Sequence, residues 1–251
     1  LGLTLLWLEL RHRLRPASPL RLQAGPFEVE AGGAGLEGSG TITLSNPHQR
    51  MEVMVPEIEL RPTLLGRGDL GGITVSSRIE ALHPDEDSRP DGYWAAYIVK
   101  GNKSTQARIR ISLGGSGGQA LDPALLDTLW LEILWINYGP FGRLQRRDAI
   151  LVPLQQPVPL TAEAARWREG DRCRVLPVGT HLLGVLDDPE AVLRRYAGGL
   201  IQPGDVLTIG ETPLAVMQGR YQHPANLAPS MLARLLCRVF HPTSSLATAC
   251  G

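Results

Sequence analysis

The chain has 251 residues, enough for one large domain or two of ordinary size. Its 25 Lys and Arg residues balance 25 Asp and Glu residues, so the charge gives no reason to expect nucleic acid or another polyanion as partner. Hydrophobic residues make up 43% and charged residues 20%, as in globular proteins, while 28 Gly and 20 Pro residues predict many turns between short strands.

The first 19 residues combine a short apolar run with a basic flank. The apolar run is far shorter than the roughly 20 residues that span a bilayer. It contains Trp7, however, and leads into a basic cluster, an order typical of the cytoplasmic end of a membrane helix. We expect residues 1–19 to be the remnant of a single-pass N-terminal membrane anchor, with the soluble part in the cytoplasm. The alternative is an ordinary amphipathic N-terminal helix. The cluster comprises Arg11, His12, Arg13 and Arg15.

The three cysteines, Cys173, Cys237 and Cys250, are odd in number and lack CxxC spacing. That pattern disfavours both a zinc site and a disulfide framework. We interpret them as reduced thiols in an intracellular compartment.

Residues 20–155 are predicted to form a β-rich domain. Apolar and polar residues alternate with a period of two in several runs that Gly, Pro and Asp turns separate. Such runs are typical of an antiparallel β-sandwich. In the strand predicted over Leu129–Tyr138, one face carries Leu129, Leu131, Ile133 and Trp135. The other runs cover residues 27–31, 41–46, 50–60, 72–82, 92–101, 106–115 and 149–155.

A proline-rich stretch, Pro153–Pro159, is interpreted as a linker to a second region, residues 160–251, in which helices and strands are mixed. Asp188 as N-cap and Pro189 at the first position predict a helix over 187–200. Two further helices are predicted over 161–171 and 228–240, and strands over 172–178, 206–209 and 214–217. The predicted fold class is therefore α+β, an antiparallel sandwich followed by a mixed α/β region.

Three motifs suggest binding chemistry, but each has a simpler interpretation. Residues 33–38, GAGLEG, match a dinucleotide pattern, yet a strand follows them, which predicts a hairpin. Residues 100–105, KGNKST, lack the glycines of a phosphate loop and are also interpreted as a hairpin. The acidic run 83–91 lacks the glycine of a calcium loop and is interpreted as a solvated loop. His181, His223 and His241 lack metal-ligand spacing and are interpreted as loop or surface residues.

The stretch VGTHLLGVLDDPEAVLRRYAGGLIQPGDVLTIGETPLAVMQGR, residues 178–220, resembles the N-terminal part of the coenzyme F420-0:L-glutamate (gamma-glutamyl) ligase family. Members carry a short helix, a Gly-Asp turn into a strand, a stretch of the form K-I-V-S-K-A-E-G-R, and a helix after Pro-Ser. The resemblance covers Val175–Gly251, and the whole chain is similar to membrane-anchored cyanobacterial proteins with this label.

The resemblance implies that residues 160–251 are the truncated N-terminal part of an α/β ligase domain. The family joins L-glutamate to a phosphate-containing cofactor with GTP and a divalent metal, Mg²⁺ or Mn²⁺. This implies a nucleotide and a small-molecule substrate as partners, besides the membrane. The acidic metal ligands of the family would lie beyond Gly251.

The family motif matches this chain only in part. The two lysines of the pattern fall on Thr212 and Val216, and its glutamate falls on Gln218. Arg220 is the residue expected to contact phosphate, and Glu211 is expected on the metal side. The alternatives are a surface role for Arg220 and a catalytically degenerate, membrane-associated binding or scaffold protein. The resemblance implies substrate- or nucleotide-binding roles for Gly204, Asp205, Glu211, Thr212, Gln218, Gly219 and Arg220.

Overall fold

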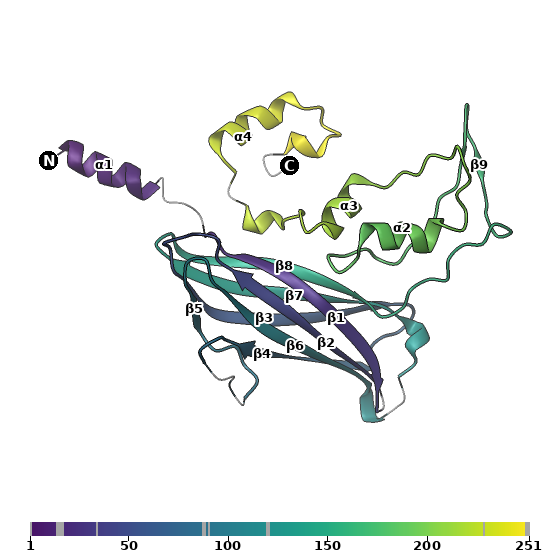
Figure 1. The fold of residues 1–251 in the computed structure, drawn as a ribbon, viewed down its shortest axis with the longest axis horizontal. Coiled ribbons are helices and arrows are strands. Elements are labelled where there is room, and N and C mark those ends of the chain that lie inside the picture. Colours follow the sequence, from purple (N-terminus) through teal and green to yellow (C-terminus); the bar gives the residue numbers. More distant parts are fainter. Residues whose placement is uncertain are drawn as a thin grey trace.

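The fold is an antiparallel β-sandwich followed by a mostly helical region (Figure 1). The computed structural model describes residues 2–13, 18–33, 35–86, 89, 91–118, 121–227 and 229–248. The predicted α+β class is confirmed. The first sheet has the order β1 (Arg21–Gly32), β2 (Gly35–Ser45), β6 (Ser104–Gly115), β4 (Ile73–Leu82), and the second the order β5 (Tyr97–Val99), β3 (Val53–Gly66), β7 (Leu126–Gly139), β8 (Gly142–Pro153).

Strand β7 shows why the two sheets pack together. Its alternating pattern directs four large apolar side chains to one face, and each is at most 2% exposed in the core. Trp130, on the other face, is 45% exposed. The face predicted from the sequence is therefore confirmed. Burial of each such side chain contributes about 1.5–3 kcal/mol to folding. The four are Leu129, Leu131, Ile133 and Trp135.

The glycine-rich motif at residues 33–38 lies in the β1–β2 hairpin, as predicted. Its glycines have a packing role, because the ring of Phe27 lies directly over Gly38 and Gly40 of the paired strand. A Cβ on Gly38 would lie 2.8 Å from that ring, closer than real Cβ contacts allow. The register of β1 shifts between Ala24 and Phe27, so a β-bulge sets the position of Phe27.

The turn at residues 100–103 carries the chain from one sheet to the other. The Lys103 N–H donates to the Lys100 carbonyl at 3.1 Å, and Asn102 adopts a φ of 56°. Strand β5 before the turn pairs with β3, whereas β6 after it pairs with β2 and β4. The hairpin predicted for residues 100–105 is therefore wrong. A sequence turn signal does not show whether the flanking strands pair with each other.

The region after β8 contains short elements. Strands β9 (Arg168–Glu169) and β10 (Arg174–Val175) form a two-stranded ribbon. The helices are α2 (Pro189–Ala197), α3 (Glu211–Met217) and α4 (Met231–Leu236). Figure 1 shows them on the β8 side of the sandwich. Single 3₁₀ turns are η1 (Ser116–Gly118), η2 (Pro123–Leu125), η3 (Pro224–Asn226), η4 (Cys237–Val239) and η5 (Ser245–Ala247).

Helix α2 forms where predicted. The Asp188 side chain accepts a hydrogen bond from the Ala191 N–H at 2.9 Å, and Pro189 follows at the first helical position. Of the residues that the sequence places on the buried side of this helix, Val192 and Tyr196 are buried, whereas Ala191 is exposed. With Met217 they form a small second core, beside which Ile209 and Leu214 are partly buried.

Three predictions for the second region are wrong. The helix predicted over 161–171 is replaced by a turn and β9, because the Gly170 N–H bonds to the Cys173 carbonyl and reverses the chain. Residues 206–209 form no strand, and Val206 is 86% exposed. Residues 214–217 belong to α3, where Leu214 and Met217 lie three positions apart on one helix face.

The helix predicted over 228–240 is shorter than expected. Helix α4 covers only Met231–Leu236, with η4 after it. The Ser230 hydroxyl caps it by accepting from the Ala233 N–H at 3.1 Å. Its apolar residues are exposed, Met231 by 89%, so the apolar face faces no core in the described chain.

Helix α1 covers Gly2–Arg13, and its apolar side chains are exposed, Leu3 by 84%. Within the described residues, no helix is both long enough and apolar enough to cross a bilayer. The side chains of the basic cluster, Arg11–Arg15, lie outside the described residues, as does Cys250. Cys173 and Cys237 are free thiols.

Candidate functional site

The predicted site residues lie in two turns and at both ends of α3. Gly204 adopts a φ of 97° in a turn, and the Asp205 side chain closes it by accepting from the Gln202 N–H at 2.8 Å. Glu211 and Thr212 form the first turn of α3 and are exposed. The carboxylate of Asp205 therefore serves the turn itself.

The other predicted residues follow the C-terminal end of α3. Gln218 caps the helix, Gly219 adopts a φ of 65°, and the Arg220 N–H bonds to the Ala215 carbonyl at 2.9 Å. A helix of seven residues is roughly 10 Å long, so Glu211 and Arg220 lie at opposite ends. The structure does not bring the two into one pocket. Among the described residues, no three His, Cys, Asp or Glu side chains are grouped so as to hold a metal ion.

A buried polar network lies just before α2. His181 is only 8% exposed, and its Nδ1 lies 2.8 Å from the Tyr196 hydroxyl. Its Nε2 lies 2.9 Å from Asp187 Oδ1, while Asp187 Oδ2 accepts from the Gly184 N–H at 2.7 Å. An ionised carboxylate only accepts, so Nε2 donates to Asp187 and, in the neutral ring, Nδ1 accepts from Tyr196. His181 thus lies in a loop, one of the two interpretations made from the sequence, but its side chain is buried rather than on the surface.

This network fastens α2 to the turn at residues 184–187, and that turn packs on the sandwich. A Cβ on Gly184 would lie 2.9 Å from the Leu151 Cβ on β8, so only glycine fits there without displacement. Val185 and Leu186 pack against the sandwich core. The turn joins the two regions of the chain.

A second attachment is made by Asn226, at the end of η3. Its Oδ1 accepts from the Arg147 N–H at 2.8 Å, and its Nδ2 donates to the Arg147 carbonyl at 2.7 Å. Strand β8 is an edge strand, whose outer backbone groups have no strand partner. The Asn226 amide thus supplies both hydrogen bonds that a neighbouring strand would make. Arg146 adds a bond to the Asn226 carbonyl at 3.3 Å.

Next to this attachment, β8 carries a mostly buried carboxylate. Asp148 Oδ2 accepts from the Trp135 indole N–H at 2.6 Å. Burial raises the pKa of Asp148, and the Trp135 hydrogen bond, Arg146 and His223 lower it by less. The carboxylate of Asp148 therefore takes up a proton at a higher pH than an ordinary carboxylate does. His223 and His241, interpreted from the sequence as loop or surface residues, both lie outside helices and strands; His223 is half-buried and His241 is exposed.

The sequence did not reveal the hydrogen-bond partners of His181, Asn226 and Asp148, because these partners are not neighbours in sequence. Asn226 and Arg147 are 79 residues apart, His181 and Tyr196 are 15 apart, and Asp148 and Trp135 are 13 apart. Asp187, which has partners three and six residues away, was also missed. The only usable signal was the apolar setting of His181 beside Leu182 and Leu183.

The sandwich with its helical extension defines an Ig-like β-domain that carries a following segment. Residues 21–156 match the family model described as "F420-0:gamma-glutamyl ligase, N-terminal Ig-like domain". Because the match covers more than half of the chain, this chain belongs to the F420-0:gamma-glutamyl ligase family, as the resemblance implied. The match lies on the β-rich region, whereas the sequence resemblance was noted in residues 175–251.

The solved structures that match this chain show low similarity to it. The GAE domain of GGA2p from Saccharomyces cerevisiae is 6% identical with a TM-score of 0.30, covering 57% of this chain and 96% of that one. The CupB6 tip adhesin from Pseudomonas aeruginosa is 13% identical with a TM-score of 0.31, covering 54% and 51%. A FixG-related protein from Vibrio parahaemolyticus is 8% identical with a TM-score of 0.25, covering 53% and 95%. No curated protein matches the sequence.

The first prediction concerns Asn226. Replacing it with Ala removes two hydrogen bonds from Arg147, each worth about 1 kcal/mol. We expect the Arg147 amide to exchange with solvent at least about tenfold faster, measured by hydrogen exchange with NMR detection. Asn226→Asp retains the acceptor only and should give a smaller increase. Gln222→Ala, at an exposed amide in the same segment, is the control. Unchanged Arg147 exchange in Asn226→Ala would show that the attachment does not hold in solution.

The second prediction concerns pH and Asp148. Because the pKa of Asp148 is raised in the folded state, that state binds the proton more tightly than the unfolded chain. The ionised carboxylate therefore costs stability at neutral pH, and the cost disappears as the pH falls through the raised pKa towards the ordinary carboxyl value. Asp148→Asn stays neutral and keeps an acceptor for Trp135.

We therefore expect Asp148→Asn to be more stable than the parent chain at neutral pH, with a difference that shrinks near pH 4. Urea unfolding of both proteins at the two pH values measures it. A difference that instead grows on acidification would mean that the folded state favours the ionised carboxylate.

Proposed function

We propose that this chain forms the Ig-like domain and the first part of the catalytic domain of an F420-0:gamma-glutamyl ligase. The reaction is the joining of L-glutamate to a phosphate-containing cofactor with GTP and Mg²⁺ or Mn²⁺. The observation that carries the proposal is the family match over residues 21–156. In this proposal, residues 20–155 form one domain and residues 160–251 belong to the ligase domain.

The Ig-like domain acts as a support in this proposal. Its edge strand β8 holds the following segment at Arg147, through Asn226, and at Leu151, beneath Gly184. Two separate attachments restrict rotation, because a single one would leave the segment free to pivot. The sandwich then fixes where α2 and α3 lie, and with them the Gly219–Arg220 turn.

Arg220 is the residue proposed to contact a phosphate of the nucleotide. Its exposed guanidinium provides a charged donor for phosphate oxygens. Glu211 is proposed on the metal side. The metal requirement rests on the family resemblance, because the described residues do not fit a metal site.

The second candidate is a catalytically degenerate, membrane-associated binding or scaffold protein. The observation in its favour is that Thr212 and Val216 stand where the family pattern has two lysines, and Gln218 stands where it has a glutamate. Val216 is also half-buried in α3, which suits packing better than phosphate binding.

The third prediction separates these candidates. Calorimetric titration of the full-length protein, including the ligase residues that this proposal places after Gly251, is performed with GTP and GDP, with and without Mg²⁺ or Mn²⁺. The ligase proposal predicts micromolar binding that requires metal and weakens about tenfold in Arg220→Ala, since one charge-assisted contact is lost. Arg234→Ala, at an exposed arginine on α4, is the control. Absence of binding at millimolar nucleotide contradicts the ligase proposal and supports the scaffold.

We further propose that α1 inserts into a membrane and that the rest of the chain lies on its cytoplasmic side. The support is the exposure of apolar side chains around the helix, which fits a lipid environment. The exposed leucines of α1 are Leu3, Leu5, Leu6, Leu8 and Leu10.

The fourth prediction tests this placement. Flotation with anionic lipid vesicles should carry the chain to the top of a density gradient. Leu6→Asp should reduce the floated fraction at least about fivefold, because a charged side chain in an apolar environment is costly. Gln222→Asp, which adds the same charge at an exposed residue outside α1, is the control. Equal flotation of the parent chain and Leu6→Asp contradicts insertion of α1.

A further inference from the structure

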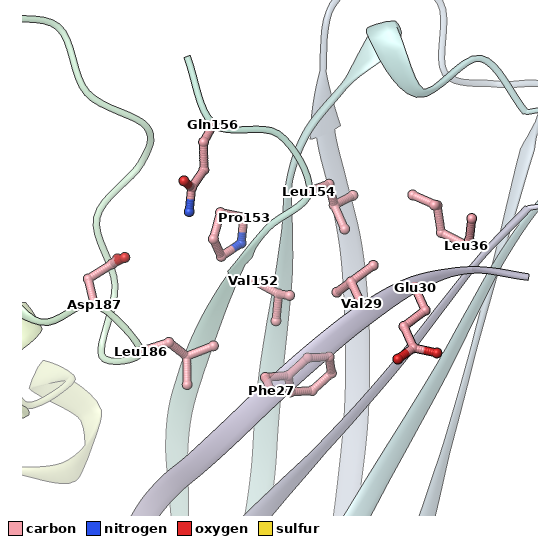
Figure 2. A pocket seen from close by; sticks show the side chains of 11 residues that line it. Phe27, Val29, Glu30, Leu36, Val152, Pro153, Leu154, Gln156, Leu186 and Asp187 are labelled. Carbon is pink, nitrogen blue, oxygen red and sulfur yellow. The ribbon is translucent and has the colours of Figure 1, made fainter. Parts of the chain in front are cut away.

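A cavity of about 400 Å³ lies at the side of the sandwich where β1 and β8 form the edges of the two sheets. Figure 2 shows Phe27 and Val29 on one side of it and Leu186 on the other. Since a cavity of about 150 Å³ can hold a benzene-sized group, this one has room for about two apolar side chains. Its apolar lining comprises Phe27, Val29, Leu36, Val152, Leu154 and Leu186.

The backbone of β1 is unpaired on the side away from β2. Strand β1 is the first of its sheet, and β2 is its one strand partner in the described chain. In an antiparallel pair, every second residue directs its N–H and C=O groups away from the partner strand. The bulge and Pro26 interrupt the strand before Phe27, so the regular part of this free edge begins there. Residues 27–31 therefore offer a backbone template for another strand.

Side chains alternate along this edge, apolar on one face of the sheet and acidic on the other. Phe27 and Val29 are half-buried and pack against the sandwich core. Glu28 and Glu30 are exposed on the outer face. Glu30 lies opposite Glu37 of β2, and two like charges in this position repel each other. A cation on the free side of β1 would offset that repulsion.

Strand β6 shows how the same sheet accommodates a strand of alternating apolar and basic residues. Residues 107–111 of β6 have the sequence ARIRI. Ile109 and Ile111 are buried in the core. Arg110, on the outer face, forms an ion pair with Glu80 of the neighbouring β4 at 2.9 Å. A strand of this pattern thus fits beside a glutamate on the outer face of the sheet.

We propose that β1 binds an extended segment of a partner protein, which joins the sheet as a further strand and alternates apolar and basic residues. Its backbone pairs with the free edge of residues 27–31. Its apolar side chains enter the cavity against Phe27 and Val29, and its basic side chains lie beside Glu28 and Glu30. In such strand addition, backbone hydrogen bonds give affinity and alternate side chains give specificity. The proposal does not depend on ligase activity, because none of these residues belongs to the predicted nucleotide site.

The fifth prediction uses three pentapeptides with blocked ends, VRLRV, VELEV and the scrambled RRLVV. Titration of the chain at low salt, followed by amide NMR shifts, should give VRLRV a Kd of about 1 mM or lower. The acidic peptide should not bind, because its carboxylates would lie beside Glu28 and Glu30. The scrambled peptide keeps the composition and charge of VRLRV but loses the alternation, so it should bind at least about fivefold more weakly. The shifts should map to residues 27–31 and 152–154.

Hydrogen exchange separates strand addition from a purely electrostatic contact. With about 10 mM VRLRV, the β1 amides that point away from β2 should exchange about fivefold to tenfold more slowly, because they become hydrogen-bonded. The amides of β4, at the other edge of the sheet, should not change. Unchanged exchange of the outward β1 amides in the presence of bound peptide would overturn the proposal.

The matched variants reverse two charges each. Glu28→Lys/Glu30→Lys should abolish binding of VRLRV and should bind VELEV instead, because the charges beside the added strand are exchanged. Glu52→Lys/Glu57→Lys makes the same change at exposed residues of the other sheet and should keep the preference for VRLRV. The proposal is overturned if VRLRV and RRLVV bind equally, if the β1 variant keeps the parent's preference, or if VRLRV does not bind at about 10 mM.

Discussion

Strand β8 is an edge strand, and the hydrogen bonds and packing contacts along its outer edge position the chain that follows it. Its inner face completes the sandwich core through Ile150 and Val152. Its outer edge presents backbone groups that a sheet would normally pair. At Arg147 the Asn226 side chain takes the place of a strand, and at Leu151 the backbone of Gly184 packs closely. These contacts shield part of the β8 edge from solvent, and they also hold the chain around Gly184 and Asn226 in place.

The region after β8 depends on these contacts because its own core is small. Three side chains, Val192, Tyr196 and Met217, form its buried cluster. A core of this size supplies little of the free energy needed to order so many residues. The His181–Asp187–Tyr196 network adds hydrogen bonds that are fully paired, which a buried polar group requires to avoid a cost. Hydrogen bonds between specific polar groups thus stabilise the region after β8, in place of a larger apolar core.

The sandwich was predictable from sequence, and much of the second region was not. Period-two alternation gave the buried face of β7 correctly, because each strand buries one face for its whole length. The strands predicted within residues 206–217 were wrong because the apolar run Val206–Ile209 pairs with no strand, and because Pro213 lies near the start of α3. The hairpin predicted for residues 100–105 failed for a related reason, since strand pairing is a long-range property. No local pattern marks Asn226 as the partner of Arg147.

The turn at residues 184–187 links α2 and the C-terminal end of α3 to the sandwich. Gly184 touches Leu151, Asp187 holds His181 and through it Tyr196 of α2, and Leu186 lines the cavity beside Phe27. Val185 reaches the other way, since its Cγ2 would lie 3.7 Å from a Cβ on Gly219. The same short segment that Gly184 and Asp187 hold in place therefore also packs beside the turn that begins at Gly219. The position of the Gly219–Arg220 turn thus depends on the contact of residues 184–187 with β8.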